Sequence, residues 1–321
     1  MTKPSQRTTP ASSVLASAPA LTTPPEAIAH AWAQVGAALS PNPDCPLPAW
    51  RGGGDTLHEH LMVIASEQEA DVVSQLRHLE TAAARFGKVG FVGPASVRRL
   101  VEWSLGDRVI VLSRMPQDVS DWDMRCPLGS LARALGPHAA ATHAGLPFLR
   151  VLGTPTRHWR DRLAASAQHG LCVGLAWPAS HLTAIHQIAE FMMPQGQPAL
   201  LQVPGVTWVP IGLPETAADV SASFDHADWI DWRQDCEDLA DEAALIDNLD
   251  LVISLDSTRT HLAGGLGVPV WHVDTPQTDT SEVQLGGYSQ MRRFTGRPPE
   301  ALALVIQALH DLSADFQGWT R

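Results

Sequence analysis

The sequence predicts an α/β fold built on parallel sheets, and three observations lead to that class. Short apolar runs that end in turn residues recur along the chain and alternate with stretches of helical periodicity. Strands joined through helices of this length form crossover connections, which place neighbouring strands parallel. The chain has 321 residues, 45% of them hydrophobic and 17% charged, which is enough for two globular domains.

Eight apolar segments are predicted to be strands because each is short and ends in turn residues or at a predicted helix. In order they are HLMVIA (60–65), KVGFV (88–92), RVIVL (108–112), DWDMRC (121–126), LCVGLAW (171–177), VTWVPIG (206–212), DLVISL (250–255) and VPVWHV (268–273). The glycine-rich segment RGGGDTLHEHL (51–61) precedes the first strand instead of following it. We therefore expect a surface turn there and not a phosphate-binding loop.

Five segments between or after these strands have helical periodicity. They are ADVVSQLRHLETAAARF (70–86), PASVRRLVEW (94–103), PLGSLARAL (127–135), CEDLADEAALIDNL (236–249) and PEALALVIQALHDL (299–312). The stretch GLPFLRVLGTPTRHW (145–159) has glycines and prolines but no periodicity, so we expect a linker between an N-terminal and a C-terminal α/β unit.

The first 25 residues are rich in Pro, Ser, Thr and Ala, and we expect a disordered tail. Lys3 and Arg7 before an apolar stretch imitate a signal peptide, but serine and proline interrupt that stretch. Residues 27–39 form one helix at most, and no apolar run approaches the ~20 residues that span a bilayer. The sequence thus indicates a cytoplasmic protein without a membrane span.

The side chains that often bind metals or sugars form no convincing set. The four cysteines are scattered, without C-x-x-C spacing, so we expect reduced thiols and no zinc. The closely spaced histidines lack a carboxylate or cysteine frame and are better explained as surface or core residues; they are His58, His60, His181 and His186. Trp229 and Trp232 are expected to pack, with stacking on a sugar or base as the less favoured alternative.

The net charge of −12 argues against a nucleic-acid partner. Between Glu215 and Asp250 there are twelve acids and one base, Arg233, so this segment alone contributes −11. A solvated face is the favoured interpretation, and a basic partner or acceptor is the alternative.

Residues 250–273 combine a strand, a polar turn and a helix in the order typical of anion sites. DLVISL is followed by Asp256 and Ser257, either of which is a good N-cap for a helix from about 258 to 266. Backbone N–H groups and the hydroxyls of Ser257, Thr258 and Thr260 would then face a diphosphate, and His261 could donate to it. Alternatively, Asp256 and Ser257 only cap the helix and His261 is an interior histidine.

DLVISLDSTRTHLAGGLGVPVW (250–271) closely resembles the motif of bacterial glycosyltransferases often fused to tetratricopeptide repeats and related to the heptosyltransferases. Weaker similarities follow the same order along residues 47–312. They are LPAW (47–50), LMVIASEQEADVVSQLRHL (61–79), WDMRCPLGSLARALG (122–136), HWRDRL with CVGLAW (158–177), VPGVTWVPIG (203–212) and LADEAALIDNLDLVIS (239–254).

The resemblance implies a GT-B fold, in which two Rossmann-like domains with parallel sheets face a cleft. It divides the chain into a tail with one possible helix (1–44), an N-terminal acceptor domain (45–150) and a C-terminal nucleotide-sugar domain (151–297). The last segment, 298–321, would be a helix that crosses back to pack on the N-terminal domain.

The resemblance also implies an activity: inverting, metal-independent transfer of a sugar from a nucleotide diphosphate sugar to a hydroxyl of a saccharide or protein acceptor. No cofactor beyond the donor substrate is implied. Asp71 would be the catalytic base, and the nucleotide sugar would be bound by Asp256, Ser257, Thr258, Thr260, His261, Gly264 and Gly265. The alternative is a catalytically lapsed glycosyltransferase fold that acts as a binding or scaffold module.

Several positions depart from the family pattern and favour that alternative. The family's loop after the first strand has glycines where this chain has Gln68 and Ala70, and Glu69 adds a negative charge beside Asp71. Glu242 follows Asp241 where the family has threonine. The arginine expected near 191–192 and the Asp-Trp-Arg-Trp segment after 273 are absent, although Arg77 and Tyr288 match.

The composition of the tail generates the first prediction. Removal of residues 1–25 is expected to leave the cooperative thermal melt intact, because a Pro- and Ser-rich segment contributes little apolar surface to a core. Circular dichroism of the shortened and full chains checks this. A shortened chain that melts without cooperativity would show that the tail packs on a domain.

Overall fold

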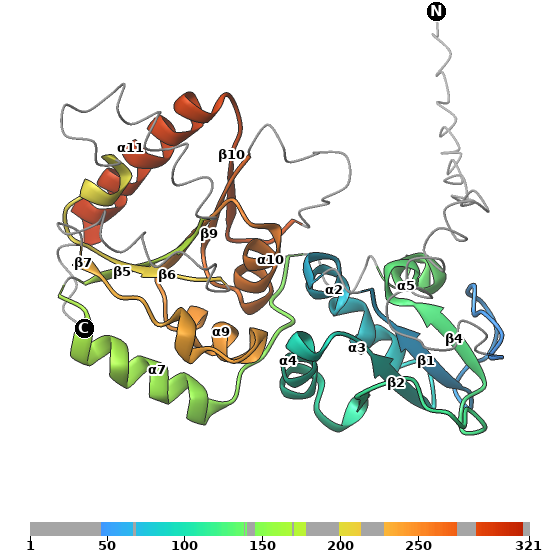
Figure 1. Ribbon diagram of the computed structural model, residues 1–321. Helices are drawn as coiled ribbons and strands as arrows, with labels where there is room; N and C mark the ends of the chain where they lie inside the picture. The colour runs from blue at the N-terminus through green and yellow to red at the C-terminus, as the bar shows by residue number, and fades with distance from the viewer. Residues whose placement is uncertain are drawn as a thin grey trace, which may run out of the picture.

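A computed structural model describes residues 46–66, 69–137, 139, 145–168, 170–177, 199–212, 228–274 and 287–316. These residues form two parallel β-sheets with helices on their faces, as the alternation of strands and helices predicts (Figure 1). The α/β fold class is confirmed. The sheets lie in two units, called here the N-terminal domain (β1 to α5) and the C-terminal domain (α7 to α11).

The N-terminal domain has a four-stranded sheet in the order β3-β2-β1-β4, with every pair parallel. Its strands are β1 (His60–Ile64), β2 (Lys88–Val92), β3 (Ile110–Leu112) and β4 (Met124–Pro127). Its helices are α2 (Glu69–Gln75), α3 (Arg77–Ala83), α4 (Ala95–Leu105), the 3₁₀ turn η1 (Gly106–Arg108) and α5 (Leu128–Leu135). β1 lies centrally and is buried along almost its whole length, as its apolar run predicts.

The C-terminal domain has a six-stranded parallel sheet in the order β10-β9-β8-β5-β6-β7. Its strands are β5 (Leu171–Ala176), β6 (Val206–Pro210), β7 (Asp228–Trp229), β8 (Leu251–Ser254), β9 (Val270–Val273) and β10 (Met291–Phe294). Its helices are α7 (Gly153–Ser166), η2 (Ala199–Gln202), η4 (Arg233–Asp235), α9 (Leu239–Ile246), α10 (Ser257–Leu266) and α11 (Pro298–Phe316).

Both sheets change direction of winding at their centres. The chain runs outward from β1 to β3 and then returns to place β4 on the other side of β1. It likewise runs from β5 to β7 and then returns to place β8 beside β5. In open parallel sheets, ligands bind beyond the carboxyl ends of the strands at such switch points. Two helices that leave these points are α2, after β1, and α10, after β8.

The two switch-point helices contact each other, so the carboxyl edges of both sheets meet at the boundary between the domains (Figure 1). A second contact joins α4 to α9. One buried apolar cluster includes side chains of both sheets, among them Val63 of β1 and Val252 of β8. Arg99 of α4 adds an ion pair across the boundary, since its Nη2 lies 2.8 Å from Asp241 Oδ1 and its Nη1 lies 3.3 Å from Asp238 Oδ2.

Four differences from the predicted elements concern local geometry. The long helix expected over 70–86 is two helices, with Leu76 between α2 and α3. The second half of the predicted linker is the start of α7, where Pro155 in the first turn costs no helical hydrogen bond. The strands β7 and β10 were not predicted, because one is two residues long and the other carries two arginines.

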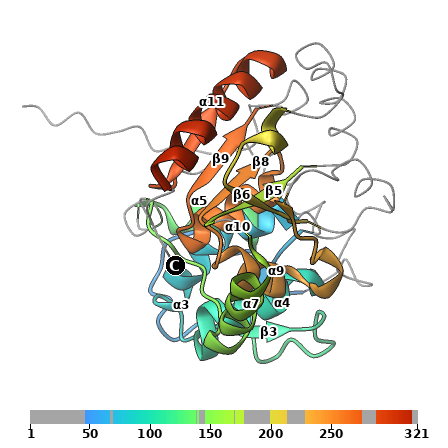
Figure 2. The same cartoon turned by 90° about the vertical axis from the view of Figure 1, so that its left-hand side faces the viewer.

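The last helix differs most from expectation. Its buried side chains, Ala301, Leu302, Val305 and Leu309, belong to an apolar cluster with β5, β6 and β8. The hydroxyl of Ser313 donates to the carbonyl of Pro204 in the same domain. In Figure 1 the described part of α11 lies along the C-terminal sheet, away from α2 to α5, and Figure 2 shows the same helix beside β9 of that sheet. The prediction that this helix packs back on the N-terminal domain is therefore wrong for its described residues, because its apolar stripe covers its own sheet.

The glycine turn before β1 agrees with the prediction. Gly52, Gly53 and Gly54 have φ between 80° and 104° and form an exposed turn before β1. The cysteines of the described ranges are thiols, and burial raises the pKa of Cys126 to about 12. Within the described ranges, no helix is both long and apolar enough to cross a bilayer.

The Arg99 contacts generate the second prediction. Arg99→Met is expected to lower the free energy of unfolding by ~1 kcal/mol or less, because the ion pairs are partly exposed. The loss should be larger at low salt, where Asp238 and Asp241 repel each other without screening. Urea unfolding at low and high salt measures both losses. Equal losses at the two salt concentrations would show that the arginine acts through packing alone.

Candidate functional site

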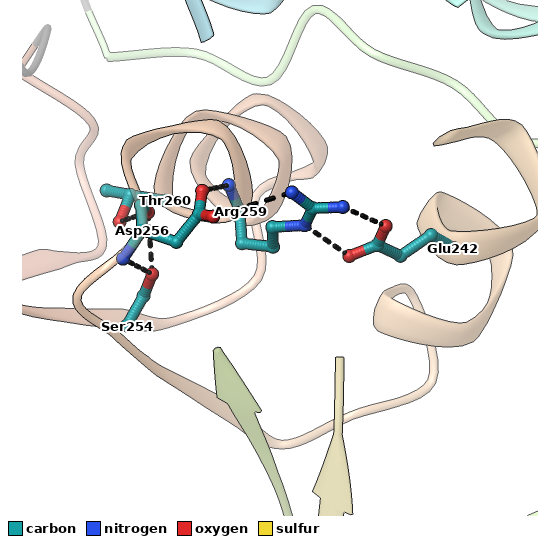
Figure 3. A network of polar contacts seen from close by, with 5 residues as sticks. All are labelled: Glu242, Ser254, Asp256, Arg259 and Thr260. Atoms are coloured by element: carbon teal, nitrogen blue, oxygen red, sulfur yellow. Dashed lines mark hydrogen bonds and ion pairs between the residues drawn. The ribbon is translucent and has the colours of Figure 1, made fainter. Parts of the chain in front are cut away.

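The joint between β8 and α10 is held by short-range hydrogen bonds around Asp256. Asp256 has extended backbone angles, and its Oδ1 accepts the N–H of Arg259 at 3.0 Å (Figure 3). The hydroxyl of Ser254 donates to the Asp256 carbonyl at 2.6 Å and accepts the Asp256 N–H at 2.9 Å. The prediction of an N-cap at this position is confirmed, and the cap is Asp256.

A buried ion pair lies beside this cap. Arg259 Nε and Nη2 donate to the two carboxylate oxygens of Glu242 at 2.8 and 2.9 Å, and Arg259 Nη1 lies 3.4 Å from Asp256 Oδ2 (Figure 3). Arg259 is 6% exposed and Glu242 is 4% exposed. Burial alone would lower the pKa of Arg259, but the Glu242 carboxylate outweighs burial and raises it above the ordinary range.

The next turn of α10 contains a second buried network. Thr260 Oγ1 donates to the Asp256 carbonyl at 2.8 Å and lies 2.8 Å from His272 Nδ1. Because a hydroxyl has one hydrogen and a carbonyl only accepts, the threonine accepts its second bond from His272. That assigns the proton of the neutral imidazole to Nδ1. Burial lowers the pKa of His272, which favours this neutral form.

His261 is an interior residue that has a hydrogen-bond partner. Its Nδ1 lies 2.9 Å from the hydroxyl of Tyr288, and the side chain is 2% exposed. Burial lowers the pKa of His261 to about 4, with a further contribution from the charge of Arg77. Arg77 comes from α3 of the N-terminal domain, and its guanidinium lies 5.0 Å from the centre of the Tyr288 ring. His261 is therefore neutral and lies at the boundary between the domains.

Gly264 and Gly265 of α10 allow neighbouring side chains to approach the helix closely. A Cβ at Gly264 would lie 2.5 Å from the ring of Tyr288, and a Cβ at Gly265 would lie 2.7 Å from the side chain of Leu149. The carbonyl of Gly265 accepts the N–H groups of Phe148 and Leu149 at 2.8 and 2.9 Å. The absence of side chains at these glycines thus allows Phe148, Leu149 and Tyr288 to pack against the helix.

Five of the seven predicted donor-site residues lie in the cap and first turns of α10, and the other two, Gly264 and Gly265, lie further along the helix. Asp256 and Ser257 are partly exposed there, whereas Thr258, Thr260 and His261 are buried. The helix that carries these residues contacts α2 at the boundary between the domains. The structure is also compatible with the alternative, since Asp256 caps the helix and His261 has an interior partner.

Asp71 lies in α2, the helix that contacts α10, but its side chain is outside the described residues. Gln68 also lies outside them. Ala70 is helical, so its missing glycine removes no left-handed residue at that position. Glu69 begins α2 and lies within electrostatic reach of Arg259. The predicted base and the donor helix therefore come from contacting elements.

The acidic segment is only partly a solvated face. Among its described residues, 228–250, acids form ion pairs with four arginines, three of which come from other helices. The pairs are Asp231 with Arg233, Asp235 with Arg162, Asp238 and Asp241 with Arg99, and Glu242 with Arg259. The expectation of a solvated face fails here because the segment packs against α4, α7 and α10.

The remaining candidates are resolved in part. The Trp232 ring lies 5.6 Å from the Trp159 ring with an interplanar angle of 34°, and the guanidinium of Arg162 lies 4.4 Å from the centre of the Trp232 ring and 4.8 Å from that of Trp159. Packing is therefore the better interpretation for Trp232. The described residues contain no group of three or more His, Cys, Asp or Glu that could hold a metal ion. His181, His186 and residues 191–192 lie outside the described residues.

The sequence did not indicate the contacts of three residues at the site, Arg259, His272 and Tyr288. Arg259 stood inside the motif, but nothing in its spacing indicated that Glu242 was its partner. His272 lies within the strand β9, and the contacts of His272 with Thr260 and of Tyr288 with His261 depend on tertiary structure. A polar residue inside an apolar strand was the one available signal, since such a residue needs a buried partner.

Two solved structures of glycosyltransferases align with most of this chain. A glycosyl transferase family 9 protein from Veillonella parvula aligns with 82% of this chain and 99% of its own, with a TM-score of 0.57 and 11% identity. ADP-heptose LPS heptosyltransferase II from E. coli aligns with 81% of this chain and 99% of its own, with a TM-score of 0.54 and 13% identity. The chain therefore has the GT-B fold of these heptosyltransferase-type enzymes.

The sequence comparisons are weaker. Protein FlbA of Caulobacter vibrioides is 26% identical over 257 residues, which is 73% of this chain and 42% of FlbA. The chain thus spans about two-fifths of the length of this curated relative. No family model matches the sequence.

The buried histidine generates the third prediction. The pKa of His261 is about 4 in the folded chain and 6.5 in the unfolded chain. The neutral imidazole therefore makes its full contribution to the free energy of unfolding above pH 6.5, and this contribution is lost as the pH falls from 6.5 to 4. The full contribution is on the order of 3 kcal/mol. His272 acts in the same direction. His261→Gln, which can still bond to Tyr288, is expected to flatten this part of the stability profile.

Urea unfolding of both proteins across this pH range measures the difference. The carboxylates titrate in both proteins, so only the difference between the two curves reports on His261. Parallel curves would contradict a buried, neutral imidazole.

Proposed function

We propose that the protein is a glycosyltransferase that takes a sugar from a nucleotide diphosphate sugar and transfers it to a hydroxyl acceptor. One observation carries the proposal: the helices that leave the two switch points, α2 and α10, contact each other. A donor held at one carboxyl edge would therefore lie beside groups from the other. The heptosyltransferase-type fold supports the same class of reaction by analogy.

In the proposed reaction, Asp71 takes the proton of the acceptor hydroxyl. The acceptor oxygen then attacks the anomeric carbon from the face opposite the diphosphate, the bond from that carbon to the diphosphate oxygen breaks, and the configuration inverts. The amide groups and hydroxyls at the start of α10 (Ser257 and Thr258) stabilise the leaving diphosphate. This arrangement uses helix amides in place of a divalent cation. The acceptor is a saccharide or a protein.

A binding module without turnover is the second candidate, and the charges around α10 favour it. Three carboxylates, Glu69, Asp256 and Glu242, surround Arg259, and the guanidinium bonds to Glu242 through two of its nitrogens. A diphosphate entering this site meets a net negative surrounding, which weakens its binding. His261 also has a neutral imidazole and contributes no positive charge.

The proposed base generates the fourth prediction. Asp71→Asn is expected to lower turnover by ~10²–10⁴, the usual contribution of a positioned base, while nucleotide affinity stays the same. Turnover is followed by release of nucleoside diphosphate from ADP-, UDP- and GDP-sugars, and affinity by calorimetry. Asp107→Asn, on the exposed η1 turn of the same domain, is the matched control and should change neither quantity.

The wild-type protein separates the two candidates. If the wild-type protein binds a nucleotide sugar and turns it over, and Asp71→Asn loses this turnover, the transferase is supported. Binding of a nucleotide sugar without any release of nucleoside diphosphate would support the binding module. An Asp71→Asn variant with full turnover would remove Asp71 from the mechanism.

A further inference from the structure

The side chain of Arg259 lies where four elements meet. Its guanidinium bonds to Glu242 of α9 and lies 3.4 Å from Asp256 at the end of β8. A Cβ at Gly212, just after β6, would lie 3.8 Å from its Nε. Glu69, at the start of α2 in the N-terminal domain, is within its electrostatic reach. Arg259 is thus a buried cation at the carboxyl edge of the sheet, surrounded by carboxylates from both domains.

Arg259 also contacts both oxygens of the cap residue. Its backbone N–H donates to Asp256 Oδ1, and its guanidinium lies beside Asp256 Oδ2 (Figure 3). Glu242 holds the guanidinium in place through two hydrogen bonds. A cap carboxylate can accept from the second or the third amide of its helix. Here the carboxylate accepts from the third amide, that of Arg259, and not from those of Ser257 or Thr258.

We propose that Glu242 and Arg259 are positioning residues for the nucleotide-sugar site. The pair fixes the Asp256 carboxylate on the amide of Arg259, which leaves the amides of Ser257 and Thr258 for the oxygens of a diphosphate. Arg259 also offsets the negative charge of the surrounding acids, which would otherwise repel that diphosphate. The inference rests on the proposed function, and it deepens it by assigning a role to a residue pair away from the reacting atoms.

A purely structural role is the competing explanation. Removing one partner leaves a buried charge unpaired and destabilises the fold in either case, so single deletions are uninformative. Replacing both partners with apolar side chains of similar length is often neutral for stability. The double variant Glu242→Met with Arg259→Met therefore keeps the fold but releases the Asp256 side chain. The matched control is Glu80→Met with Arg108→Met, an ion pair of the N-terminal domain.

Hydrogen exchange of the amide at position 259 is the first measurement, and it requires no ligand. The double variant is expected to exchange roughly tenfold faster at this amide, the factor that corresponds to loss of a cap hydrogen bond. Affinity for ADP, UDP and GDP, measured by calorimetry, should fall by a similar factor for whichever nucleotide the wild type binds. The control variant should match the wild type in both measurements.

The two measurements fail separately. Unchanged exchange at position 259, or unchanged nucleotide affinity in a folded double variant, overturns the inference. A wild-type protein that binds none of the three nucleotides counts against the proposed function, while the exchange result still decides whether the pair positions the cap.

Arg259→Lys covers the case in which the double variant does not fold. Lysine keeps the charge beside Glu242 but has no planar fork with which to hold both carboxylates. Faster exchange at position 259 in this folded variant supports the inference, and wild-type exchange there overturns it.

Discussion

The rest of the structure depends on how closely α10 can be approached. Its middle carries Gly264 and Gly265, and a Cβ at either position would lie within 2.7 Å of a neighbouring side chain. Because side chains are absent there, Tyr288 reaches His261, and the N–H groups of Phe148 and Leu149 donate to the Gly265 carbonyl. These contacts hold Tyr288 and residues 148–149 against α10, the helix that contacts α2 at the boundary between the domains.

The packing of the helices also explains how the acids of the C-terminal domain are paired. A chain with a net charge of −12 would repel itself if its acids were crowded without partners. Arg99, Arg162 and Arg259 come from three different helices and each meets acids of residues 235–242. The acids nearest the domain boundary therefore help to hold the domains together, and α9 is the element that carries them. This helix bonds to α4 through Arg99 and to α10 through Glu242.

Local patterns were enough to predict the frame of this fold. All eight predicted strands are present, because buried parallel strands such as β1, β5 and β8 are continuous apolar runs with turn residues after them. The cap at Asp256 was also readable, since capping is a local interaction. The break at Leu76, the location of α11 and the partners of Arg259, His261 and Thr260 were not. Each depends on contacts between residues far apart in sequence, which periodicity and spacing do not encode.

The departures from the family pattern have a different meaning once their surroundings are known. Glu242 stands where the family has a hydroxyl, and a buried carboxylate without a partner would cost several kcal/mol. It is therefore compatible only with a chain that also supplies a cation in reach, and Arg259 is that cation. Ala70 lies in a helix and needs no glycine, while Glu69 lies in the field of the same arginine. Taken singly, Glu69, Ala70 and Glu242 suggest a site that has lost its function. In the structure, each of them has a charged partner or a compatible conformation. They describe an altered charge arrangement around α10, and they do not by themselves argue that nucleotide binding has been lost.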